Sequence, residues 1–152
     1  MVLADDEALL RKALAAPLPL EGDIAVRAEA ADGEDAVRAA PRYRPDVLVI
    51  DLEMPGVDGL SAVAAIRSVR PDQVILMLTR HARPGVLRRA LKLGVQGFVS
   101  KSAEPAHIAS VIARQLRLAE GTVRNYLSNA MRKTQAQTRH EAARYAREHD
   151  WL

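Results

Sequence analysis

The sequence contains no cysteine and few aromatic residues, with one Phe, three Tyr and one Trp among 152 residues. The lack of cysteine excludes disulfides, thiolate metal sites and a cysteine nucleophile. The scarcity of aromatic residues requires an aliphatic core, and the many Ala, Leu and Arg residues favour helices between short Val- and Ile-rich strands. No apolar run approaches the length of a membrane span, and no signal-like segment opens the chain. We therefore expect a cytoplasmic protein that does not insert into a membrane.

The length and the charge distribution point to one α/β domain followed by a small basic part. With 152 residues, 49% of them hydrophobic, the chain can form one domain with a core and a short appendage. Residues 1–112 carry 14 Lys and Arg against 15 Asp and Glu, whereas residues 113–152 carry 8 against 4. A basic C-terminal part suits a polyanionic partner, and the solvated face of a short helical tail explains the same charge equally well.

Strand-like and helical segments alternate along the first 112 residues. Short apolar runs predict five strands, at Val2–Ala4, Ile24–Ala30, Val47–Ile50, Val74–Leu78 and Val95–Val99. Amphipathic spacing predicts helices between them, at Glu7–Ala16, Gly33–Ala40, Leu60–Val69 and Val86–Leu93. This alternation predicts an α/β fold, a doubly wound five-stranded parallel sheet with helices on both faces.

The stretch VLVIDLEMPGVDG, residues 47–59, ends a buried strand on the carboxylate of Asp51. Ligands of such sheets bind outside the carboxyl ends of the strands, where the loops converge. The polar residues that follow the other predicted strands at this end are Asp5, Asp6, Thr79, Ser100 and Lys101. We therefore expect these side chains to converge with Asp51 at one edge of the sheet.

The residue types in this set predict phosphoryl chemistry. Three converging carboxylates repel one another unless a cation neutralises them, and hard oxygen ligands around an open position suit Mg²⁺. The ammonium of Lys101 and the hydroxyl of Thr79 would supply donors to an anion attached to Asp51. A carboxylate can attack phosphorus, and a divalent ion would spread the charge that develops on the phosphoryl group. Each residue alone has an ordinary explanation, since an Asp after a strand is most often a helix cap or turn residue.

Four segments resemble the receiver domain of two-component response regulators: ADDEALL, VLVIDLEMPGVDGL, ILMLT and GVQGFVSKS. The resemblance covers residues 1–112 and implies a CheY-like, flavodoxin-like receiver fold. It implies that Asp51 is the residue that a histidine kinase phosphorylates. It also implies a magnesium site, formed with Asp51 by Asp5, Asp6 and the backbone carbonyl of Glu53.

The same resemblance implies a switch at the ends of the fourth and fifth strands. Lys101 would contact the phosphoryl group, Thr79 would turn towards it and Phe98 would rotate, although Phe98 also fits simple core packing. A phosphoryl group adds about −1.5 to −2 charges and several acceptor oxygens, so donors are drawn towards it and a partner-binding face repacks. Glu53 and His81 occupy positions where the family tunes the lifetime of the phosphoryl group, and His81 equally fits an exposed loop.

The C-terminal segment IARQLRLAEGTVRNYLSNAMRKTQAQTR predicts two helices separated by a break near residues 119–121. In the second helix an apolar stripe with helical spacing comprises Val123, Leu127, Ala130 and Met131. The candidate DNA contacts on the remaining faces are Thr122, Arg124, Asn125, Ser128, Arg132 and Lys133. Arg124, Asn125 and Ser128 suit base edges in a major groove, and the other three suit phosphates.

This segment resembles the helix-turn-helix of the LuxR/NarL/FixJ class, with Thr122–Lys133 as the recognition helix. The resemblance implies double-stranded promoter DNA as a partner. The tail TRHEAARYAREHDWL resembles the last helix of that class, which commonly pairs two DNA-binding domains. The segments EHDWL and RHARPG are most similar to DesR-type regulators of membrane-lipid genes.

The junction between the two parts departs from the pattern of the class. AHIASVI runs directly into ARQLRL, without the linker and the first helix that the class places there. Residues 113–152 are therefore expected to form an incomplete helix-turn-helix region. Two explanations are open. The one that we favour is that this sequence joins pieces of a longer protein and omits its linker and first helix. The other is that both segments are truly deleted.

These features predict a phosphorylation-controlled, DNA-binding response regulator that acts as a transcription regulator and not as an enzyme. Phosphorylation of Asp51 would favour a homodimer that places two basic helices on adjacent half-sites. Two alternatives are a stand-alone receiver that acts by protein contact and has a non-DNA-binding tail, and a Mg²⁺-dependent phosphatase. The phosphatase is disfavoured because only Glu53 offers a second acid two residues after Asp51, and no substrate-covering insertion is present. The sequence does not specify the kinase, the promoter, the sign of regulation or the dimerisation face.

Overall fold

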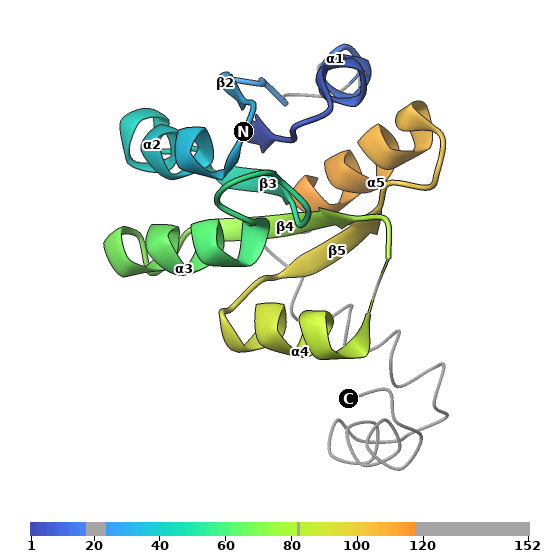
Figure 1. Cartoon of the computed structure of the whole chain (residues 1–152). Helices are drawn as coiled ribbons and strands as arrows, with labels where there is room; N and C mark the ends of the chain where they lie inside the picture. The colour runs from blue at the N-terminus through green and yellow to red at the C-terminus, as the bar shows by residue number, and fades with distance from the viewer. Residues whose placement is uncertain (18–23, 82, 118–152) are drawn as a thin grey trace.

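The computed structural model of the chain describes residues 1–17, 24–81 and 83–117. These residues contain a five-stranded parallel sheet with the strand order β2-β1-β3-β4-β5 (Figure 1). The strands are β1 (Val2–Ala4), β2 (Ala28–Ala30), β3 (Val47–Asp51), β4 (Val74–Thr79) and β5 (Gly97–Ser100). The predicted doubly wound sheet is confirmed.

Helices cover both faces of the sheet. They are α1 (Ala8–Ala15), α2 (Gly33–Tyr43), α3 (Gly59–Val69), α4 (Pro84–Lys92) and α5 (Pro105–Arg117). Helices α2, α3 and α4 pack on one face, and α1 and α5 on the other (Figure 1). Alternate residues of β3 enter the two cores, Leu48 and Ile50 below α2 and α3, Val47 and Val49 below α1 and α5. Burial on both faces explains why the strand is a continuous apolar run.

Several element boundaries differ from those predicted, and three of the differences have a clear structural reason. Strand β2 is limited to Ala28–Ala30, because it pairs at the sheet edge only with the three residues of β1. Helix α2 continues past Ala40 to Tyr43 and ends where Arg44 adopts a left-handed conformation. Strand β5 begins at Gly97, since the N–H of Val95 still donates to the carbonyl of a residue in α4.

Gly59, the first residue of α3, lets this helix begin directly against the end of β3. A Cβ at this position would overlap the carbonyl oxygen of Asp51 and would lie 2.9 Å from the Cα of Leu52. The Gly59 N–H also donates to the Leu52 carbonyl over 3.0 Å, so the backbone cannot withdraw without losing that hydrogen bond. The absence of a side chain at Gly59 therefore holds the loop after Asp51 in place.

We expect Gly59→Ala to lower the free energy of unfolding by about 1–3 kcal/mol, because the new methyl group would clash with the backbone of Asp51 and Leu52. Urea unfolding followed by circular dichroism measures this as a lower midpoint with an unchanged slope. Gly85→Ala is the matched control, because a Cβ at Gly85 has nothing within 4 Å. An equal loss of stability in both variants would contradict this account of Gly59.

Within the part of the chain that the structure describes, none of the helices combines the length and the apolar character that a membrane crossing requires.

Candidate functional site

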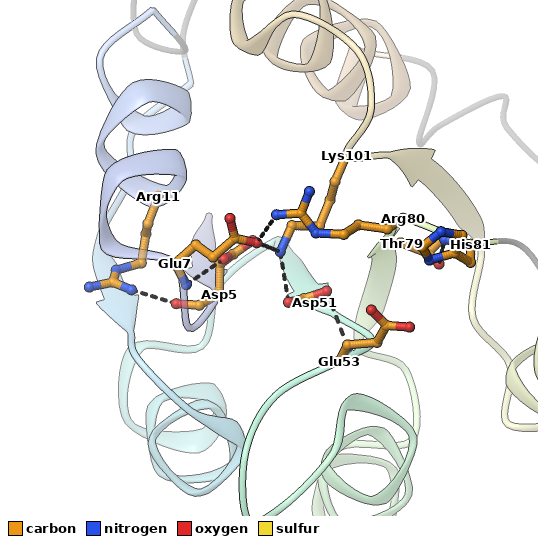
Figure 2. Close-up of polar contacts among 9 residues, drawn as sticks. All are labelled: Asp5, Glu7, Arg11, Asp51, Glu53, Thr79, Arg80, His81 and Lys101. Carbon is orange, nitrogen blue, oxygen red and sulfur yellow. Dashed lines mark hydrogen bonds and ion pairs between the residues drawn. The ribbon is translucent and has the colours of Figure 1, made fainter.

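The candidate site lies at the carboxyl ends of β1 and β3, where the strand order reverses. The register pairs Ala4 of β1 with Ile50 of β3. The next residue of each strand is therefore Asp5 or Asp51, and these two carboxylates come to lie side by side (Figure 2). Both residues are buried, with relative exposures of 0% and 1%. The parallel pairing thus brings together two acids that are far apart in the sequence.

Local hydrogen bonds fix one oxygen of each buried carboxylate. Asp5 Oδ1 accepts the N–H of Glu7 over 2.8 Å, and Asp51 Oδ1 accepts the N–H of Glu53 over 3.2 Å. These two-residue turns are a common role for Asp in loops. The N-cap role, the ordinary explanation for an Asp after a strand, falls instead to Asp58, which accepts the N–H of a residue in α3. The second oxygens of Asp5 and Asp51 are left to interact within the site.

The side chain of Lys101 reaches these two acids from the residue after β5. Its Nζ lies 2.8 Å from Asp51 Oδ2, 2.9 Å from Asp5 Oδ2 and 2.8 Å from Glu7 Oε1. The backbone N–H of Lys101 donates to the Thr79 carbonyl over 2.9 Å, which anchors the start of its side chain beside β4. Lys101 is buried, so this ammonium interacts with the carboxylates with little screening by water.

The pKa values of Lys101 and Asp51 are both raised in this site. Burial alone would lower the pKa of Lys101, but its bonds to Asp51, Glu7 and Asp5 outweigh burial and raise that pKa well above its usual range. Burial also raises the pKa of Asp51, and the opposing effects of Lys101 and of the Glu53 N–H do not cancel it. The acids around Lys101 outnumber it, so the site retains an excess of negative charge that favours a further cation.

The acidic side chains fit a magnesium ion. One ligand oxygen from each of Asp5, Asp6 and Asp51 lies within 4.8 Å of the other two. Asp6 is exposed, which leaves the cluster open to solvent on one side. Asp5 Oδ2 is buried without a hydrogen bond, although Lys101 Nζ lies 2.9 Å from it. Hard carboxylate oxygens, one of them lacking a donor, are the ligands that Mg²⁺ prefers.

The predicted switch residues lie at the edge of this cluster or away from it. Thr79, the last residue of β4, is buried, and its Oγ1 accepts the N–H of His81 over 3.2 Å. Figure 2 shows these two residues on the far side of Asp51 from Glu7. Phe98 in β5 is partly buried and packs against the core below α2, α3 and α4. Among the described residues, no hydrogen bond joins the Thr79 hydroxyl to Asp51.

Two charged residues of the site were missed by the prediction from sequence. Glu7, at the N-cap position of α1, forms ion pairs with both Lys101 and Arg80. These contacts lower the pKa of the half-exposed Glu7 carboxyl. Each missed residue directly follows a predicted one, Glu7 after Asp6 and Arg80 after Thr79. Their position next to predicted site residues was the only signal in the sequence that could have indicated them. It does not show whether their side chains point into the site.

The candidate DNA contacts lie outside the described residues. These are Thr122, Arg124, Asn125, Ser128, Arg132 and Lys133. Their assignment stays a prediction from the sequence.

Comparison with known proteins gives two family matches. The response regulator receiver domain matches residues 1–113, and the luxR family of bacterial regulatory proteins matches residues 109–146. The two matches overlap within α5, so no residues remain between them for a linker.

Curated relatives resemble the chain along its whole length. It is 29% identical to the transcriptional regulatory protein YvfU of Bacillus subtilis, with 100% of this chain and 98% of the relative covered. It is also 29% identical to the transcriptional regulatory protein DesR of the same organism, with 99% and 97% covered. The alignment with YvfU spans 197 positions against 152 residues here, so at least 45 of its positions are gaps in this chain.

A solved structure supports the same relationship for the first part of the chain. The signal receiver domain of NarL from Mycobacterium tuberculosis superposes with a TM-score of 0.69 at 32% identity, covering 76% of this chain and 94% of that one. Regulators that combine a receiver with a LuxR-type region are transcription regulators and not enzymes. The chain therefore belongs to the response regulators: it is a DNA-binding regulator of a two-component system, with a receiver domain followed by a LuxR-type DNA-binding region.

Proposed function

We propose that Asp51 is the phosphoacceptor of this regulator and that a histidine kinase supplies the phosphoryl group. The observation that carries this proposal is the position of Lys101 Nζ, 2.8 Å from Asp51 Oδ2 and beside the Asp5, Asp6 and Asp51 cluster. Burying an acid in contact with a cation and next to further acids costs folding free energy. Such arrangements are concentrated at functional sites. Phosphoryl transfer uses all of these groups.

In the transfer, a carboxylate oxygen of Asp51 attacks the phosphorus of a phosphohistidine. The new O–P bond forms as the N–P bond breaks, and the electron pair stays on the imidazole nitrogen, which then takes up a proton. Lys101 neutralises part of the charge on the phosphoryl oxygens. Burial of its side chain fixes the position of the ammonium that does so. Dephosphorylation is a separate reaction: water attacks the phosphorus, the O–P bond to Asp51 breaks, and the products are the Asp51 carboxylate and inorganic phosphate.

Asp5, Asp6 and Asp51, with the backbone carbonyl of Glu53, would hold Mg²⁺. When bound, the ion supplies positive charge to the transferring phosphoryl oxygens. Asp5 contributes the buried oxygen that lacks a hydrogen bond, and exposed Asp6 leaves room for water ligands. In the phosphorylated state the hydroxyl of Thr79 donates to a phosphoryl oxygen.

The output follows from the division of the chain into a receiver, residues 1–112, and a DNA-binding region, residues 113–152. Movement of Thr79, accompanied by rotation of Phe98, alters the face formed by α4 and β5. We infer that this change favours a homodimer, which presents two recognition helices to adjacent half-sites of double-stranded promoter DNA. A regulator that acts on DNA and receives a phosphoryl group from a kinase works in the cytoplasm.

Binding to duplex DNA tests the output directly and separates the regulator from a stand-alone receiver. We expect a random duplex to be shifted in a gel, with an affinity that falls as salt rises, because phosphate contacts release counterions. Lys133→Ala should reduce the salt slope by about one, and Arg124→Ala should weaken binding to a selected site by about tenfold. Lys12→Ala, an exposed cation on α1, is the control. Absence of any salt-dependent shift would favour the stand-alone receiver.

A further inference from the structure

We propose that Glu7 and Arg80 form an ion-pair latch over the phosphoacceptor site, in which Glu7 competes with the phosphoryl group for Lys101. The name Glu7–Arg80 latch is used below for this pair. The inference rests on the proposed role of Asp51 as phosphoacceptor. It assigns to two charged residues a task in controlling which anions enter the site.

The latch is visible as a chain of charges across three strand ends. Glu7 Oε1 lies 2.8 Å from Lys101 Nζ, and the same oxygen accepts a hydrogen bond from the guanidinium of Arg80 (Figure 2). Glu7 follows β1, Arg80 follows β4 and Lys101 follows β5. The pair therefore joins segments 73 residues apart and lies on the solvent side of buried Asp51.

The competition follows from the crowding of acids around the ammonium. Three carboxylate oxygens, from Asp5, Glu7 and Asp51, already lie within 2.9 Å of the Lys101 nitrogen, and Asp51 Oδ2 accepts a hydrogen bond from it. A phosphoryl oxygen that approaches Lys101 is repelled by these carboxylates, so its binding is favoured when one of them leaves. Asp5 and Asp51 are buried, whereas the Glu7 side chain is 41% exposed and regains water when it leaves. Glu7 is thus the partner that costs least to displace.

Displacement of Glu7 also releases Arg80. The Arg80 side chain is 45% exposed, and the residue directly follows Thr79 at the end of β4. Once free, its guanidinium can bind phosphate oxygens through two parallel hydrogen bonds. An anion that displaces Glu7 therefore gains two cations to bind, the Lys101 ammonium and the Arg80 guanidinium. The latch favours phosphoryl groups, which can engage both cations, over smaller or less charged anions.

The experiment uses the full chain with Mg²⁺ and two probes, acetyl phosphate as phosphodonor and beryllofluoride as a phosphoryl mimic. We expect Glu7→Gln to raise the initial rate of phosphorylation and the affinity for beryllofluoride by about fivefold, because both cations become free. Arg80→Gln should lower both by about fivefold, and Arg80→Lys should restore part of the loss. Both effects should shrink in high salt, since the pair is exposed. Glu34→Gln, which breaks an exposed ion pair on α2, is the matched control.

Opposite changes in the Glu7 and Arg80 variants support the latch, since a purely structural role would move both in one direction. Rates and affinities of both variants equal to those of Glu34→Gln would overturn it, as would a loss in Glu7→Gln. Glu7→Ser provides a second variant, because Ser is a favourable N-cap residue and should preserve α1. If the unchanged chain itself takes up no phosphoryl group, the proposed role of Asp51 fails instead of the latch.

Discussion

Asp51→Asn is expected to abolish phosphorylation of the chain, lowering the rate with acetyl phosphate and Mg²⁺ by about a thousandfold or more, as loss of a nucleophile does elsewhere. The amide has nearly the same shape as the carboxylate, but its oxygen carries no negative charge with which to attack phosphorus. Intact-mass spectrometry measures this result, because the unchanged chain gains a single phosphoryl group. Chelation of Mg²⁺ should suppress the gain as well.

Asp58→Asn is the control for Asp51→Asn, since Asp58 caps α3 and faces solvent. It should be phosphorylated as readily as the unchanged chain. Phosphorylation that persists in Asp51→Asn would place the acceptor elsewhere. Repeated hydrolysis of an external phosphate ester, without a stable adduct on the protein, would indicate the phosphatase alternative.

The raised pKa of Asp51 adds a pH dependence to this prediction. Because burial raises its pKa above the value in the unfolded chain, the protonated form is favoured by folding. The stability that this provides is present at low pH and is lost as the pH rises through the folded pKa of Asp51. The phosphorylation rate should fall over the same range as the pH is lowered, because the nucleophile becomes protonated. Asp51→Asn should therefore be more stable than the unchanged chain at neutral pH, and this difference should vanish in acid.

Lys101→Met is expected to lower the free energy of unfolding by about 3–5 kcal/mol at neutral pH, as is typical when one partner of a buried ion pair is removed. Met has a similar length and fills the same space, so the loss comes mainly from leaving Asp5 and Asp51 buried without a cation. Urea unfolding at several pH values measures the effect. Lys92→Met, at an exposed position on α4, is the control and should change little.

The origin of the Lys101→Met loss can be separated from simple repacking. On the alkaline side, the raised pKa of Lys101 means that its contribution persists up to the unfolded pKa and is lost only as the pH rises through the folded value. On the acid side Asp51, whose pKa is raised, becomes protonated, so the cost of removing Lys101 should shrink there. Mg²⁺ should restore part of the stability of Lys101→Met by binding the folded state. In Asp51→Asn/Lys101→Met the loss should be smaller than in Lys101→Met alone, because one of the two buried carboxylates left without a cation is gone. A loss independent of pH and of Mg²⁺ would point to packing.

Much of the fold could be predicted because it depends on local, periodic features. Continuous apolar runs such as VLVI indicate strands buried on both faces, and their alternation with amphipathic helices indicates a parallel sheet. The boundaries of β2 and α2 could not be predicted in the same way. The boundary of β2 depends on the length of its neighbour β1. The end of α2 depends on the last helical hydrogen bond, from the Arg44 N–H to the Ala40 carbonyl.

Which chemistry the sheet edge can hold follows from the amino-acid order alone, because every parallel strand ends on the same side. That rule is enough to place Asp5, Asp6, Asp51 and Lys101 at one edge. How their charges are matched depends on the three-dimensional packing: Lys101 reaches across the end of β4 to three acids, and Glu7 pairs with both Lys101 and Arg80. The physical reason is that strand direction follows from the backbone pattern, whereas the reach and pairing of long charged side chains depend on rotamers and burial across separate strands.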